Sequence, residues 1–259
     1  MHKIVLPLIT LLTFSTSLMA ENNETEVLED MSDPLAVYTR GGLGVTNRGL
    51  NIKMGLEYKS NDINKQNMHI LEIKGFGGEA IGWDGAYERS NSVDSLRYRH
   101  VSLDKTDKRG TQIDITYDFH SESGVISYSL LQGLPKWWDF NLYPLAGLGV
   151  AYANNALQDD GRTNSGFSVP GVLAVVGLYG RYMVTDNIWI NYNPFWTVGL
   201  TGSDLFMDQG IEGHSSVVTH EAALSYKLSQ RSNIRYFGNW SQYTYFRDGV
   251  HRLEYNYQF

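Results

Sequence analysis

The chain has 259 residues and a net charge of −7, with 28 acidic side chains against 21 basic ones and no cysteine. This balance argues against nucleic acid as a partner, because binding to a polyanion depends on an excess of Lys and Arg. The lack of cysteine excludes disulfides, thiolate metal sites, a Cys nucleophile and a lipid-anchoring Cys.

Residues 1–20 have the pattern of a secretory signal peptide. Lys3 gives a basic start, residues 4–14 are apolar, and residues 15–20 are small or polar. An N-terminal membrane anchor is the alternative, but the apolar stretch contains Pro7 and is shorter than the roughly 20 residues that a membrane helix needs. We therefore expect cleavage, with the mature chain beginning at Glu21.

The next segment, residues 21–35, is rich in acidic residues and contains Pro34. Its low hydrophobicity predicts a solvated acidic tail on the periplasmic side. Its acidic side chains are Glu21, Glu24, Glu26, Glu29, Asp30 and Asp33.

Beyond residue 20 the sequence has strand periodicity and no stretch of 18 apolar residues, which argues against helical membrane spans. Residues 49–59 and 111–120 show apolar and polar side chains in strict alternation, as expected for strands with one wet face. We predict twelve strands, at 36–44, 49–59, 67–76, 95–104, 111–120, 124–134, 140–153, 170–184, 188–200, 216–228, 233–246 and 250–259. Ten strands is the alternative, because 67–76 and 95–104 alternate poorly.

The lengths of the connections predict a transmembrane barrel. With the C-terminus on the periplasmic side, the three longest connections, 77–94, 154–169 and 201–215, all fall on the outside. Short periplasmic turns and long outer loops are typical of bacterial outer-membrane barrels. The predicted fold is therefore all-β, a closed antiparallel transmembrane barrel over residues 36–259.

The last strand has every apolar side chain on one parity and ends on an aromatic residue, with Leu253, Tyr255, Tyr257 and Phe259 in alternation. This pattern resembles the C-terminal insertion signal of Gram-negative outer-membrane β-barrel proteins, although an ordinary amphipathic last strand is the alternative. The resemblance implies location in the outer membrane, contact with its lipid, and recognition by its assembly machinery. The size is similar to that of twelve-stranded porin-like barrels and of autotransporter translocators. Since only about 15 residues separate the signal peptide from the first strand, we expect no passenger.

Charged residues on the inward parity are the candidate site. Both signs occur there, so these charges must either pair across the barrel or face water. The predicted lumen-lining residues are Lys53, Glu57, Asp114, Asp118, Glu221, Lys227, Arg235, Arg252 and Glu254.

Catalytic and metal sites are expected to be absent. Asp118 and His120 share an inward face and could form an acid/base or metal cluster, but polar side chains are expected there because the lumen faces water. His220 adjoins Glu221 on the outward parity, without a Ser or Asn in a matching hydrolase motif. We expect no cofactor.

The favoured function is a small channel for hydrophilic solutes. The alternative is a structural or interaction barrel, similar to a solitary autotransporter barrel, that binds a partner through its outer loops; a lipid-active enzyme is less favoured. Candidate loop contacts are Trp83, Tyr87, Leu205 and Phe206.

Overall fold

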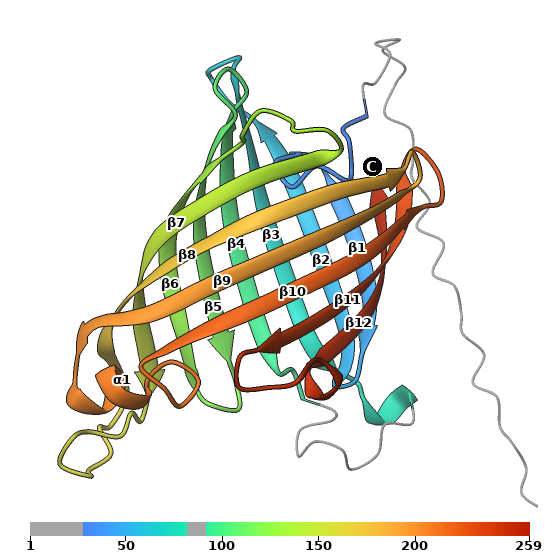
Figure 1. The fold of residues 1–259 in the computed structure, drawn as a ribbon. Helices are drawn as coiled ribbons and strands as arrows, with labels where there is room; N and C mark the ends of the chain where they lie inside the picture. Colours follow the sequence, from blue (N-terminus) through green and yellow to red (C-terminus); the bar gives the residue numbers. More distant parts are fainter. Residues whose placement is uncertain (1–27, 82–91) are drawn as a thin grey trace, which may run out of the picture.

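Alternating side chains arrange the chain as a closed ring of strands (Figure 1). A computed structural model describes residues 28–81 and 92–259. Its twelve strands are antiparallel, and their order around the ring follows the sequence until β12 pairs with β1. They are β1 Arg40–Thr46, β2 Gly49–Lys59, β3 Lys65–Phe76, β4 Ser95–Asp104, β5 Arg109–Asp118, β6 Ser123–Gln132, β7 Phe140–Asn154, β8 Phe167–Thr185, β9 Ile188–Gly202, β10 Ser216–Lys227, β11 Ser232–Ser241 and β12 Val250–Gln258. The predicted closed barrel of twelve strands is confirmed, and the ten-strand alternative is wrong.

The two ends of the barrel differ. The end with the C-terminus, here called the terminal end, has short turns, whereas the opposite loop end has long connections between β3 and β4, β7 and β8, and β9 and β10 (Figure 1). The helical segments η1 Glu79–Ile81, α1 Asp204–Gln209 and η2 Phe246–Asp248 lie in connections at the loop end. Within the described ranges, no helix has the length and hydropathy needed to cross a membrane.

The two faces of the strands have opposite chemistry. Outward positions such as Leu56, Leu148 and Leu224 are 60%, 59% and 54% exposed, so the outer face carries large apolar side chains. The inward face instead buries polar groups, among them Glu72 and Asp114. Period-two alternation therefore gives the barrel an apolar outside and a polar inside.

Two tryptophans lie on opposite faces of the barrel wall. Trp189 is only 3% exposed and points inward. Trp240 is outward and lies next to the end of β11, because this strand ends at Ser241 rather than continuing to residue 246. The chain then folds back over the outer face, where the ring of Phe246 packs on Trp240 and occupies the space that a Cβ at Gly238 would need.

The start of the barrel also differs from the prediction. The first strand begins at Arg40 instead of residue 36, and the residues before it lie inside the barrel. Leu35 and Val37 are 7% and 0% exposed, because they pack against apolar side chains of the inner wall. Residues 30–35 are thus part of the barrel interior and not a fully solvated tail.

Leu148→Arg tests which face meets lipid. Leu148 lies in the middle of β7 on the outward face, so the substitution should lower the free energy of unfolding by about 2–4 kcal/mol in lipid bilayers. Thr219→Arg on β10 is the control, because Thr219 lines the internal cavity and a long Arg side chain there can reach water. Urea unfolding of both variants in liposomes measures the difference, and equal costs would contradict a lipid-facing outer surface.

Candidate functional site: the barrel lumen

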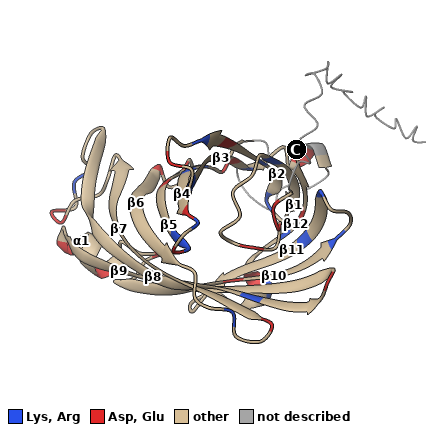
Figure 2. Ribbon diagram, turned by 90° about the horizontal axis from the view of Figure 1, so that it is seen from above, with Lys and Arg blue, Asp and Glu red and all other residues tan. Residues whose placement is uncertain are grey.

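The barrel encloses a cavity of about 680 Å³. Its walls come from strands around the barrel, with Lys53 from β2, Arg97 from β4, Glu221 from β10 and Arg252 from β12. Figure 2 looks down the barrel and shows Lys, Arg, Asp and Glu positions distributed along the strands that surround it. The volume is within the range of sites that hold small molecules.

Buried carboxylates hold most of the cations in place. Lys53 Nζ lies 2.5 Å and Arg252 Nε 3.1 Å from the two carboxylate oxygens of Glu254. Glu254 is only 4% exposed, so both cations lie between it and the cavity. This pairing offsets the cost of removing the carboxylate from water.

A second set of ion pairs lies on β3, β4 and β5. Arg97 forms a bidentate pair with Asp114, with an Nη2 to Oδ2 distance of 2.5 Å. Glu72 accepts from Arg99 and lies 3.1 Å from Lys74 Nζ. The carboxylates are again the more buried members, since Glu72 and Asp114 are 7% and 8% exposed.

Two cations of the lumen have no carboxylate partner among the described residues. Arg235 donates to Ser225 Oγ at 2.9 Å and to Asn191 Oδ1 at 2.7 Å, both neutral acceptors. Its guanidinium carbon lies 4.6 Å from the centroid of the Phe237 ring, and that of Arg252 lies 4.1 Å from the same ring. Arg40 is held only by Tyr38, through a long hydrogen bond and a cation–π contact.

The wall formed by β7, β8 and β9 is uncharged where it borders the cavity. Tyr179 and Phe195 meet edge to face, with ring centroids 5.1 Å apart, and Leu145 lines the cavity beside them. Asn193 donates to Glu221 on the next strand at 2.9 Å, which orients that carboxylate. The lumen therefore has a cationic side and an aromatic, largely neutral side.

The structure separates the nine predicted lumen residues into two groups. Lys53, Glu221, Arg235 and Arg252 border the cavity, while Asp114 and Glu254 lie in its wall beneath cations. The other three lie at strand ends. Glu57 and Lys227 are exposed at the terminal end, and Asp118 accepts hydrogen bonds from the amides of His120 and Ser121 in the turn after β5.

Sequence reasoning missed Arg97, Arg99 and Arg40. Arg97 and Arg99 alternate with Tyr98 and His100. The alternation of charged with aromatic side chains, as opposed to that of apolar with polar ones, would have placed both arginines on the inward face of β4. Arg40 was assigned to a strand that began four residues too early.

A segment from the N-terminal side crosses the lumen near the terminal end. We call residues 29–38 the inner segment. The amide of Gln66 on β3 bonds Glu29, Ser32 contacts Met183 on β8, and Val37 packs against Met68 on β3. The chain thus spans the mouth from one wall to the other and returns along the inside before β1 begins.

Polar contacts fix the middle of the inner segment to β8. Arg181 Nη1 lies 2.7 Å from Asp30 Oδ2 and 2.5 Å from Ser32 Oγ. Burial alone would raise the pKa of the Asp30 carboxyl, but the Ser32 hydroxyl and amide and the Arg181 guanidinium outweigh burial and hold the pKa below its usual value. A depressed pKa means that this contact is present at neutral pH and is lost only as the pH falls through the lowered value.

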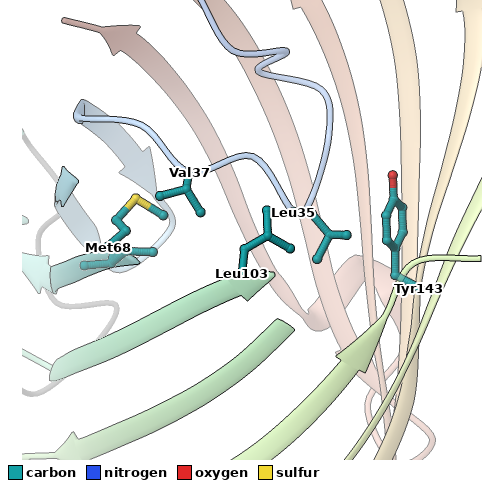
Figure 3. Close-up of a cluster of buried hydrophobic side chains, with 6 residues drawn as sticks. Leu35, Val37, Met68, Leu103 and Tyr143 are labelled. Atoms are coloured by element: carbon teal, nitrogen blue, oxygen red, sulfur yellow. The ribbon is translucent and has the colours of Figure 1, made fainter. Parts of the chain in front are cut away.

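Apolar contacts fix the rest of the inner segment. Figure 3 shows Leu35 and Val37 facing Met68, Leu103 and Tyr143 on the inner wall. Burying these side chains removes apolar surface from water, at roughly 1.5–3 kcal/mol for each fully buried large side chain. The inner segment is therefore a packed part of the lumen.

At the loop end, α1 packs into the barrel mouth. Ser203 caps its N-terminus, and the Asp159 carboxylate accepts from the amides of Asp204 and Leu205. Phe206 is 4% exposed and packs against Leu173 and Val217.

The expectation that Phe206 is a surface contact is therefore wrong, because its ring occupies the space that a Cβ at Gly171 would need. Leu205 is partly buried, and Trp83 and Tyr87 lie outside the described residues.

The candidate catalytic histidine has a local partner. His220 Nδ1 lies 2.9 Å from the hydroxyl of Tyr192, and its ring stacks with that of Trp240 on the outer face. Within residues 28–81 and 92–259, no group of three or more His, Asp or Glu side chains could hold a metal ion.

Comparison with known proteins relates the fold to outer-membrane barrels. No protein-family model matches the sequence, and no curated protein matches it. An outer-membrane channel of Pseudomonas putida F1 aligns with a TM-score of 0.55 at 10% identity, over 90% of this chain and all of that one. The NanC porin aligns with a TM-score of 0.51 at 10% identity, over 86% of this chain and 99% of that one. The chain thus has the fold of an outer-membrane β-barrel protein.

Glu254→Gln tests the role of the buried carboxylate. The substitution leaves Lys53 and Arg252 without their shared counter-charge, and we expect it to lower the free energy of unfolding by about 3–5 kcal/mol. Asp107→Asn is the control, because Asp107 forms an exposed pair with Arg109 that should contribute about 0–1 kcal/mol. Similar losses in both variants would show that Glu254 is not a structural centre of the lumen.

Proposed function

We propose that this protein is an outer-membrane channel for small hydrophilic solutes. The observation that carries the proposal is the cavity of about 680 Å³, bordered by charged and amide side chains inside a closed barrel. A packed core would have no use for this many polar groups, which are costly to bury. The two solved structures named above support the proposal, since they are described as an outer membrane channel and a porin.

The proposal also assigns the two ends of the barrel. The terminal end faces the periplasm and the loop end faces the outside, because bacterial barrels have short periplasmic turns and long outer loops. In this orientation the inner segment narrows the periplasmic mouth, and α1 narrows the outer one.

A structural or interaction barrel is the second candidate. The observation in its favour is that both mouths are partly filled, by the inner segment and by α1. The loops 77–94, 154–169 and 201–215 would then bind a surface partner.

Removing the inner segment tests the channel. We expect deletion of residues 30–37 to raise the single-channel conductance of the purified protein in a planar bilayer, because the deletion leaves the twelve strands intact and widens the periplasmic mouth.

The control locks the inner segment in place. Ser32→Cys with Met183→Cys joins two side chains whose Oγ and Sδ atoms are 3.8 Å apart, and the sequence contains no other cysteine. The oxidised variant should conduct no more than the wild type, and reduction should restore wild-type current. If neither the wild type nor the deletion variant conducts current, the channel is refuted and the interaction barrel is favoured.

Deleting Phe259 tests the proposed insertion signal. Leu253, Tyr255, Tyr257 and Phe259 project outward on the strand that closes the barrel, and the Phe259 amide donates to Thr39 at 3.0 Å. We expect the deletion to reduce the amount of heat-modifiable, folded protein in outer-membrane fractions. Phe259→Tyr is the matched control and should assemble normally; normal assembly of the deletion variant would contradict the signal.

A further inference from the structure

The charge of the lumen is opposite in sign to that of the whole chain. The chain has a net charge of −7. The middle of the lumen has seven cations against four carboxylates, an excess of three positive charges. The cations are Arg40, Lys53, Lys74, Arg97, Arg99, Arg235 and Arg252, and the carboxylates are Glu72, Asp114, Glu221 and Glu254. The two mouths add Arg48 against Asp33, Glu212 and Asp248, so the cavity as a whole has an excess of one positive charge.

The burial of these groups strengthens the asymmetry. Asp114 and Glu254, 8% and 4% exposed, lie in the wall beneath cations, while Glu72 borders the cavity at 7% exposure and the side chains of Lys74 and Arg97 are 29% and 30% exposed. A solute in the cavity therefore meets more ammonium and guanidinium groups than carboxylates. Such a charge is weakly screened in a narrow pore, so it should decide which ion enters.

Some of these donors are free for a ligand. Arg235 and Arg40 have only neutral partners among the described residues. Arg99 also borders the cavity, and Glu72 accepts from its Nη2. A guanidinium has five N–H donors in a planar fork that fits a carboxylate, so the cationic side suits an organic acid.

The aromatic side of the cavity suits a different part of a solute. Tyr179 is on β8, six strands from β2 in the ring, and its side chain reaches inward to pack against the cluster that contains Met68 and Leu103. Phe195 packs on Tyr179, and Leu145 continues this surface. Aromatic and aliphatic side chains here offer contact area without charge.

From these two sides we infer that the lumen selects organic anions whose carboxylate is attached to an apolar or aromatic body. The carboxylate faces Arg235, Arg40 and Arg99, and the body lies against Tyr179 and Phe195. This inference rests on the proposed channel function and names its substrate class.

The first experiment measures reversal potentials in a KCl gradient. We expect the wild type to pass chloride in preference to potassium, and Arg40→Gln with Arg235→Gln to move the permeability ratio toward cations. These two arginines are chosen because their neutralisation leaves the ion pairs of Glu254, Asp114 and Glu72 intact. The control, Lys105→Gln with Lys136→Gln, removes the same charge from exposed turns at the terminal end and should leave the ratio unchanged.

The second experiment uses benzoate as the organic anion and benzyl alcohol as its uncharged counterpart. Benzoate should reduce the chloride current at concentrations where benzyl alcohol has no effect. Phe195→Asn should weaken this block while leaving the chloride preference in place, and the double arginine variant should weaken both. Detergent-resistant, heat-modifiable migration of each variant shows that it is folded.

The outcomes separate the two proposals. A conducting wild type without anion preference would overturn the inference and leave the channel standing. An anion-selective wild type that benzoate does not block more strongly than benzyl alcohol would overturn the substrate class. A silent wild type and a silent deletion of residues 30–37 would refute the channel, and the inference with it.

Discussion

The structure depends on closure of the backbone hydrogen-bond ring. In hydrocarbon an unpaired N–H or C=O group costs several kcal/mol, so a sheet in lipid can have no free edge. Here β1 meets β12 over seven paired residues, from Arg40 opposite Gln258 to Thr46 opposite Arg252. Closure also creates the lumen, because every second side chain of each strand then points into one shared interior.

That interior must accommodate charge. An isolated ion is expensive to remove from water, and the lumen avoids this cost by placing each strongly buried carboxylate against cations from its own strand, from a neighbouring strand or, for Lys53 and Glu254, from the far side of β1. Because most of these pairs join different strands, they also depend on the register. The remaining cations, chiefly Arg235, are held by amide and hydroxyl oxygens and by an aromatic ring, which leaves positive charge for the cavity.

The inner segment combines two kinds of contact with different consequences. Its apolar residues cover Met68 and Ile70, which would otherwise face water inside the barrel. Its polar anchor at Arg181 is a charge-assisted contact of a half-exposed carboxylate, and such contacts are weaker than buried ones. A segment held in this way can narrow the mouth and still be displaced without opening the strand ring. The proposed function therefore rests on the residues that line the lumen and not on the barrel architecture, because the barrel is shared with proteins only 10% identical in sequence.

The sequence by itself predicted a barrel of twelve strands with ten as the alternative, most strand boundaries and the faces of the strands, because period-two alternation is a local property of the chain. It also indicated that Lys53, Arg235, Arg252 and Glu254 point inward. It could not determine that Glu254 neutralises Lys53, since residues 201 positions apart meet only when the ring closes. It missed the inward Arg97 and Arg99 because the apolar alternation of β4 is weak. The inner segment was the largest difference: the sequence predicts a solvated tail up to residue 35 and a strand from residue 36, and only the tertiary structure supplies Arg181 for Asp30 and an apolar wall for Leu35 and Val37.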